Sequence, residues 1–151
     1  MISSRRCIAF SLVAFAFAAC GGSQQNAPTV GDARDFATVC NKANEGKRVL
    51  VEGYLRLPER FNRKIGPVLR LYPTTAFSGK PVGVSTTIGG QPNQIAFIPR
   101  EYTDKDLKVN IADRQVVEFG TKVKVSGDLY YPTIAQEFPC ALSNPLVESA
   151  R

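Results

Sequence analysis

The chain has 151 residues, a length typical of one domain, and 44% of them are apolar, which is enough for a buried core. It contains 19 basic residues, 13 acidic residues and no histidine. Because histidine is the commonest general base and a common zinc ligand, this composition disfavours an enzyme or a metal site. We therefore expect no catalytic residue, no metal ion and no cofactor.

Residues 1–19 have the pattern of an export signal. Two arginines at positions 5 and 6 precede an apolar stretch over residues 7–19, which is too short to span a bilayer. The sequence SRR at residues 4–6 also matches part of a twin-arginine signal. Ala9 fits that motif poorly, so the ordinary secretory route is favoured.

The apolar stretch ends in FAAC at residues 17–20, which resembles the lipobox of bacterial lipoproteins. The resemblance implies that Cys20 becomes the new N-terminus and carries fatty acids such as palmitate, which would anchor the chain in a membrane. The residue after Cys20 is Gly21 and not Asp, which resembles the pattern of Gram-negative lipoproteins sent to the outer membrane. The implied location is the bacterial cell envelope, facing the periplasm. The alternative is a plain secretory signal with a chance cysteine.

The signal peptide and the lipid would account for two of the four cysteines. Cys7 leaves with the signal peptide and Cys20 is acylated, so Cys40 and Cys140 remain in an oxidising compartment. We predict a disulfide between them, the alternative being two buried free thiols. Loss of the two signal arginines leaves 17 basic residues against 13 acidic ones, a net charge of +4 that only weakly favours an anionic partner.

Residues 20–31 follow as a polar tether, and residues 32–151 are expected to form the folded domain. The domain begins with a segment whose apolar residues recur at helical spacing, which predicts a short N-terminal helix over residues 32–46. The residues at this spacing are Phe36, Val39, Cys40 and Ala43.

One ten-residue pattern occurs twice, as GKRVLVEGYL from Gly46 and as GTKVKVSGDL from Gly120. Both copies alternate apolar and polar residues with period two, which predicts two strands, each with a glycine at a bend. The side chains expected to face inward are Val49, Val51, Gly53, Leu55, Leu57, Val123, Val125, Gly127 and Leu129.

Further strands are predicted in VLRLYP, PVGVSTTI, QIAFIP and DLKVNI. The last candidate, FPCALSNPLVE, contains Pro139 and Pro145 and is therefore expected to be an edge or end strand. Many short strands separated by Gly, Pro and Asn predict a small all-β barrel or sandwich. An extra hairpin is expected between Ile88 and Leu107.

The segment from Asp32 to Glu148 resembles the OB-fold domains of secreted and lipid-anchored bacterial proteins, of the tRNA-anti-like type. GKRVLVEGYL is similar to their first strand, GTKVKVSGDL to their fourth and CALSNPLVE to their fifth. The implied fold is a small antiparallel Greek-key OB-fold-like barrel with a short N-terminal helix. Another type of small β-barrel and a β-sandwich remain as alternative folds.

The resemblance also implies a ligand site on the second and third strands, flanked by the loops after the first and fourth strands. A cation beside an aromatic ring can hold phosphate while the ring stacks on a base or sugar. A solvated loop with Phe61 closing the barrel is the alternative. The candidate ligand-binding residues are Arg56, Arg60, Phe61, Arg63, Lys64, Arg70, Tyr72, Tyr130 and Tyr131.

Two functions follow as expectations. The first is a membrane-anchored, non-catalytic binding or scaffold module for an envelope protein or an anionic envelope polymer. The second is an OB-fold lipoprotein that binds nucleic acid. No nucleotide-binding, hydrolase or calcium-binding motif is present in the sequence, which places an enzyme last.

Overall fold

The computed structural model describes residues 27–133 and 137–150. The export signal, Cys20 and the first part of the predicted tether lie outside the described residues. Within the described ranges no helix is long and apolar enough to cross a bilayer.

The repeated sequence forms two strands that pair with each other. β2 (Arg48–Arg56) and β7 (Lys122–Tyr130) run antiparallel, from Arg48 opposite Asp128 to Tyr54 opposite Lys122. Every side chain predicted to face inward from these strands is buried, and so are the two glycines. The period-two pattern therefore predicted both the strands and their buried face correctly.

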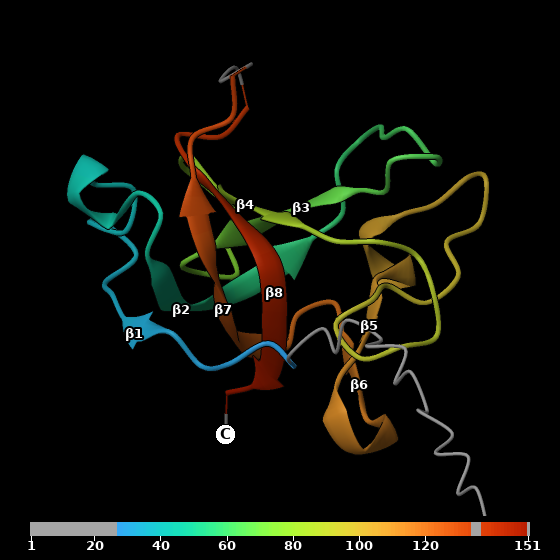
Figure 1. The fold of residues 1–151 in the computed structure, drawn as a ribbon. Helices are drawn as coiled ribbons and strands as arrows, with labels where there is room; N and C mark the ends of the chain where they lie inside the picture. Colours follow the sequence, from blue (N-terminus) through green and yellow to red (C-terminus); the bar gives the residue numbers. More distant parts are fainter. Residues whose placement is uncertain (1–26, 134–136, 151) are drawn as a thin grey trace, which may run out of the picture.

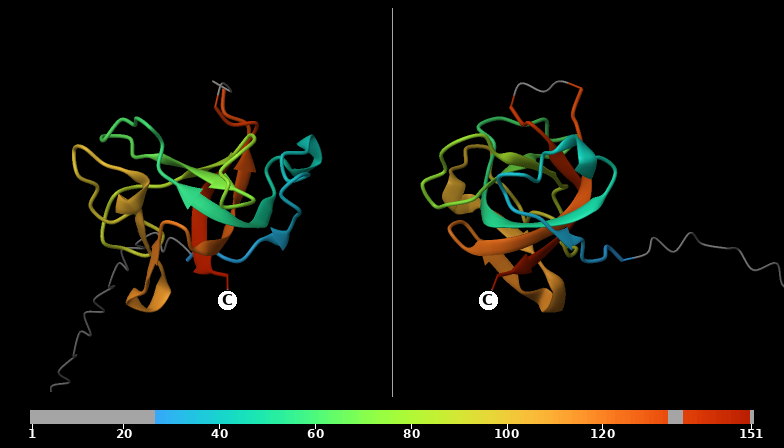
Figure 2. Two further views of the ribbon diagram at one scale, coloured as in Figure 1. Left: turned by 180° about the vertical axis from the view of Figure 1, so that it is seen from behind. Right: turned by 90° about the vertical axis from the view of Figure 1, so that its left-hand side faces the viewer.

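Three more strands complete a closed barrel: β3 (Val68–Tyr72), β4 (Val82–Ser85) and β8 (Ala141–Ser149). The strand order is β2-β3-β4-β8-β7, and β7 returns to β2. β4 and β8 are parallel, and the other four pairings are antiparallel. The strands curl into the ring seen in the right-hand view of Figure 2 (also Figure 1). The predicted class, a small OB-fold-like barrel, is confirmed.

Short elements surround the barrel. β1 (Asp32–Ala33) pairs in parallel with β2, and the 3-10 helix η1 (Lys42–Asn44) follows it. Between β4 and β7 lie η2 (Asp104–Asp106), β5 (Lys108–Asn110), η3 (Ala112–Arg114) and β6 (Val116–Glu118). β5 and β6 form a hairpin outside the barrel. The extra hairpin exists, but it lies later in the chain than the predicted range.

The predicted N-terminal α-helix is reduced to turns and the single 3-10 turn η1. Its first residues pair with β2 instead, as β1. The following turn is closed by the Thr38 amide, which donates to the Asp35 carbonyl oxygen (3.0 Å). The Asn44 side chain then donates to the Val39 carbonyl oxygen (3.0 Å). These local bonds satisfy the backbone without a continuous helix.

The predicted strand QIAFIP is not formed. Within it only Ile95 makes bridges, to Ile88 and Val109. Ile95 and Ile98 are buried whereas Phe97 is 80% exposed, so the apolar side chains do not alternate across one face. The segment is apolar without the period that a strand requires.

β8 is not an edge strand, because it lies between β4 and β7. Pro145 is tolerated there because the ladder with β7 shifts register: Ser126 faces Leu146, whereas Asp128 faces Ser143. Asn144, beside the proline, has a positive φ of 48°. A bulge of this kind leaves a residue outside the ladder, and so it accepts a residue that has no N–H to donate.

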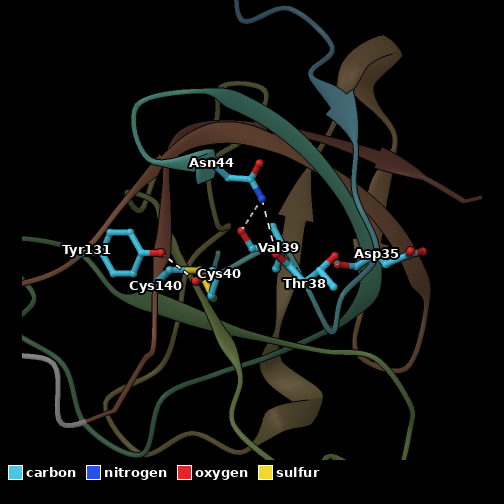
Figure 3. The surroundings of a disulfide bond; sticks show 7 residues. All are labelled: Asp35, Thr38, Val39, Cys40, Asn44, Tyr131 and Cys140. Carbon is cyan, nitrogen blue, oxygen red and sulfur yellow. Dashed lines mark hydrogen bonds between the residues drawn. A yellow bond between two sulfur atoms is a disulfide. The ribbon is translucent and has the colours of Figure 1, made fainter. Parts of the chain in front are cut away.

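The predicted disulfide is present. Cys40 and Cys140 are bonded, with their Cα atoms 5.4 Å apart, and Cys140 is fully buried. The Tyr131 hydroxyl donates to the Cys40 carbonyl oxygen (2.6 Å) and fixes the turn that carries the sulfur, as Figure 3 shows. The bond joins the segment before the barrel to the residue that precedes β8.

Glycine is required in the middle of β2 by a close approach of two backbones. A Cβ atom at Gly53 would overlap the carbonyl oxygen of Tyr72 on β3. At Gly127, opposite the bulge, a Cβ would lie 2.8 Å from Leu142 Cβ and 2.9 Å from the Ser143 oxygen. The repeated glycine therefore lets neighbouring strands approach where the sheet curls.

We predict that Gly53→Ala lowers the free energy of unfolding by about 1–3 kcal/mol, because the new methyl group forces the β2 and β3 backbones apart. Gly90→Ala is the matched control, since a Cβ at Gly90 has no neighbour within 4 Å. It should change stability by no more than about 0.5 kcal/mol. Urea unfolding of both variants tests this, and equal stabilities would contradict the packing argument.

Candidate functional site

Three of the predicted ligand residues share the outer face of β2 and β3. Arg56 lies opposite Arg70, and Tyr54 lies opposite Tyr72. Directly opposite residues project to the same side of an antiparallel pair. The sequence therefore grouped Arg56, Arg70 and Tyr72 correctly.

The two arginines of this face are already engaged by carboxylates. Arg56 Nε donates to Asp104 Oδ2 at 2.7 Å. Arg70 lies 3.5 Å from a Glu137 oxygen and 3.9 Å from a Glu59 oxygen, and its side chain is only 16% exposed. Asp104 belongs to η2, and Glu59 and Glu137 belong to two loops, so both arginines face carboxylates of the protein itself.

Tyr72 is covered by a small aromatic cluster. Its ring packs edge-on against Phe77 with centroids 5.6 Å apart, and Phe77 stacks on Phe119 at 5.2 Å. The Arg56 guanidinium lies 5.8 Å from the centre of the Phe77 ring. Tyr72 is consequently buried, although it points away from the barrel interior.

The loop between β2 and β3, residues 57–67, is tied to the segment after residue 97. Arg63 donates to the carbonyl oxygens of Ile98 (3.0 Å) and Pro99 (2.6 Å). Its guanidinium also lies 5.4 Å from the centre of the Phe61 ring. Phe61 and Arg63 thus have structural roles, which agrees with the alternative interpretation of this loop.

Phe61 packs in turn on Tyr102, with ring centroids 5.7 Å apart. The Tyr102 hydroxyl donates to the Pro58 carbonyl oxygen (2.6 Å). Burial raises the pKa of Tyr102, partly offset by the charges of Arg63 and Arg70. This phenol therefore stays protonated and keeps its hydrogen bond at neutral pH.

Arg60 and Lys64 are the two candidate cations that remain available to a ligand. Both are exposed, and within residues 27–133 and 137–150 neither forms an ion pair. They lie on the same loop as Arg63. The predicted cationic patch is thereby reduced from five basic side chains to these two.

The two tyrosines at the end of β7 have separate partners. The hydroxyl oxygens of Tyr130 and Ser85 lie 2.8 Å apart, across the barrel strands. Tyr131 belongs to the surroundings of the disulfide, with Lys42 Nζ 4.1 Å above its ring. Neither tyrosine is joined by these contacts to Arg60 or Lys64.

An open groove of about 1190 Å³ was not predicted from the sequence. It is lined by the end of β4, the bulge of β8, residues 92–94, the N-terminal residues 27–29 and Ile65. Arg48 of β2 and Asp128 of β7 also line it, so the groove is built from seven separate segments. Such a groove depends on tertiary contacts that a sequence pattern does not reveal.

One side of this groove is a network around Asp128. Arg48 Nη1 lies 3.1 Å from Asp128 Oδ1, and the side-chain amide of Asn144 donates to Asp128 Oδ2 (2.9 Å). Arg48 also donates to the carbonyl oxygens of Thr29 and Asn144. The network therefore ties the N-terminal segment to the bulge of β8.

The Asn144 hydrogen bond lowers the pKa of Asp128, and Arg48 adds to this effect, whereas partial burial opposes it. A carboxyl whose pKa is lowered on folding stabilises the fold above its ordinary pKa of about 3.9. This contribution is lost as the pH falls through the lowered value. The network should thus be intact at neutral pH.

No protein-family model matches the chain, and no curated protein or solved structure is significantly similar to it. Among the described residues there is no group of three or more His, Cys, Asp or Glu side chains placed to hold a metal ion.

We predict that Asn144→Gly raises the pKa of Asp128 toward its ordinary value, because it removes the side-chain hydrogen bond that lowers this pKa most. Glycine also adopts the positive φ of position 144 readily. Titration of side-chain carboxyl signals by NMR measures this change. Glu52 is the internal control, since its pKa is lowered by Lys122 and not by Asn144. An unchanged Asp128 titration would contradict the assigned cause.

Proposed function

We propose that this chain is a lipid-anchored protein of the bacterial envelope that acts as a non-catalytic binding or scaffold module. Its partner would be an envelope protein or an envelope polymer. The proposed anchor is Cys20, and the proposed site is the outer membrane on its periplasmic side.

The observation that carries this proposal is the combination of a lipobox-like FAAC sequence with a disulfide-linked barrel. The reducing cytosol disfavours structural disulfides, whereas they persist in the periplasm. The Cys40–Cys140 bond and the export signal therefore support the same compartment. The two features are independent, since one depends on the first twenty residues and the other on residues of the folded domain.

The ion pairs on the barrel are suited to a scaffold. Arg56 and Arg70 are paired with Asp104, Glu59 and Glu137, and these pairs hold loops in place. A closed barrel with fixed loops offers a rigid surface, which lowers the entropy lost on binding a partner.

Nucleic-acid binding is the alternative function. It would use the basic loop after β2, with Arg60, Arg63 and Lys64 for phosphates and Phe61 for stacking, and Arg56, Arg70 and Tyr72 would extend this patch along the sheet. Arg56 and Arg70 face carboxylates, Arg63 bonds carbonyl oxygens and Tyr72 is buried. Only Arg60 and Lys64 of these cations are left without such contacts among the described residues, which favours the scaffold function over this alternative.

We predict that the purified membrane form begins at an acylated Cys20 and that Cys20→Ser abolishes this modification. Mass spectrometry of the N-terminal peptide measures the added fatty acids. Cys7→Ser is the matched control, because Cys7 would leave with the signal peptide. A chain that still begins at Met1 and carries no lipid would contradict the proposal.

We predict that crosslinking in intact cells joins the chain to one stoichiometric envelope protein or to a glycan. The Cys20→Ser variant should lose this product, because it is no longer held at the membrane. The alternative function predicts instead that single-stranded DNA binds and that its affinity falls steeply with salt. Salt-sensitive DNA binding without any envelope product would overturn the scaffold proposal.

A further inference from the structure

We propose that the barrel docks on the membrane to which it is tethered, through a surface formed by Ile65 and Phe97 with the cations Arg60, Lys64 and Arg100. We call these five residues the docking surface. Its partner is a bilayer face that carries anionic lipid headgroups. This inference rests on the proposed lipid anchor and names the side of the barrel that faces the membrane.

Two apolar side chains of this surface are strongly exposed. Phe97 is 80% exposed and Ile65 is 76% exposed. Single exposed apolar residues are common, but a phenylalanine with most of its surface in water is costly unless it contacts a partner. Val30, which is 58% exposed, lies in the N-terminal segment beside the same groove as Ile65.

Contacts between loops place Ile65 and Phe97 on one side of the barrel. Arg63, two residues before Ile65, donates to the carbonyl oxygen of Ile98, which follows Phe97. The backbone at Gly66 packs closely on Thr86. Figure 1 shows residues 57–67 and the segment after β4 together on the right-hand side of the barrel.

The tip that carries Ile65 is held in a defined turn. The amides of Ile65 (3.1 Å) and Gly66 (3.0 Å) both donate to the Asn62 carbonyl oxygen. The Lys64 amide donates to the Asn62 side chain (2.9 Å). Because the turn is already ordered, presenting Ile65 to a surface requires little further loss of chain entropy.

The charge around the two apolar residues is positive. Among the described residues Arg60, Lys64 and Arg100 form no ion pair, and Arg63 bonds only uncharged carbonyl oxygens. The nearby carboxylates in the sequence are Glu59, which pairs with Arg70, and Glu101. Exposed apolar groups flanked by lysine and arginine are suited to the interface of an anionic membrane.

The described N-terminal residues lie beside Ile65, one of the five residues of this surface. Residues 27–29 line the same groove as Ile65, and Arg48 binds the Thr29 carbonyl oxygen. Seven residue steps separate Cys20 from Ala27, so the two can be at most roughly 25 Å apart. A lipid on Cys20 would therefore keep this side of the barrel close to the headgroups.

The absence of tryptophan from the chain allows a direct test. Phe97→Trp places a single fluorescent reporter on the docking surface. The full chain, purified from bacterial membranes, is reconstituted in vesicles of phosphatidylcholine with or without phosphatidylglycerol. With phosphatidylglycerol, the emission should shift to shorter wavelength and be quenched by lipids brominated in their acyl chains.

Two controls localise the effect. Ala43→Trp reports from exposed η1, on the opposite side of the barrel in Figures 1 and 2, and should keep solvent-like emission. Adding Arg60→Glu and Lys64→Glu to Phe97→Trp should reduce the docked population at least about tenfold. Lys47→Glu with Lys80→Glu changes the net charge equally and should leave docking intact.

Solvent-like, unquenched emission from position 97 in both kinds of vesicle overturns the docking proposal. So does an equal spectral shift without phosphatidylglycerol, or crosslinking of position 97 to a protein in cells in place of lipid. The mass of the N-terminal peptide is read separately. An acylated chain with solvent-like emission contradicts the docking proposal but not the proposed anchor. An unmodified chain that does not float with vesicles contradicts the proposed anchor.

Discussion

The antiparallel pairing of β2 with β7 is the constraint on which the other features of the fold depend. It brings two segments far apart in the sequence into register, so that their valines fill one core. An ion pair stands at each end of this pairing: Arg48 with Asp128, and Lys122 with Glu52. Because the pairing closes the barrel, none of its five strands is left as an open edge, and the loops are presented from a rigid frame.

The disulfide adds a second constraint at a different place. It joins the turn before β2 to the residue that precedes β8, and the bonded residues are 100 positions apart. In the chain-entropy model a loop of this length stabilises the folded state by about 4–5 kcal/mol. Such a contribution is large for a small domain, which buries a smaller share of its surface than a large one. The segment that precedes β2 is thereby fixed to the barrel.

The strands could be predicted where one face is buried, because burial imposes a period of two that is visible in the sequence. β2 follows this rule residue by residue. β7 does so except at Ser126, which is buried on the outward side, where its hydroxyl oxygen accepts a hydrogen bond from the Gly31 amide. The segment around Ile95 and Ile98 does not, since its buried residues are three apart and Phe97 points to solvent. The candidate site was predicted less well because the carboxylates that neutralise Arg56 and Arg70 come from residues 59, 104 and 137. No local pattern relates these positions to the strands that they contact.

The distribution of cations separates structural surfaces from those open to a partner. On the face of β2 and β3 the arginines meet carboxylates and the aromatic rings cover one another, so this face is completed by the protein's own loops. Arg60, Lys64 and Arg100 lie instead on the loops that expose Ile65 and Phe97, and Ile65 lines the same groove as residues 27–29. Among the described residues, unpaired positive charge and exposed apolar area thus coincide on these loops. A partner that compensates both at once must offer anionic and apolar groups together, and the headgroup region of a bilayer has this composition.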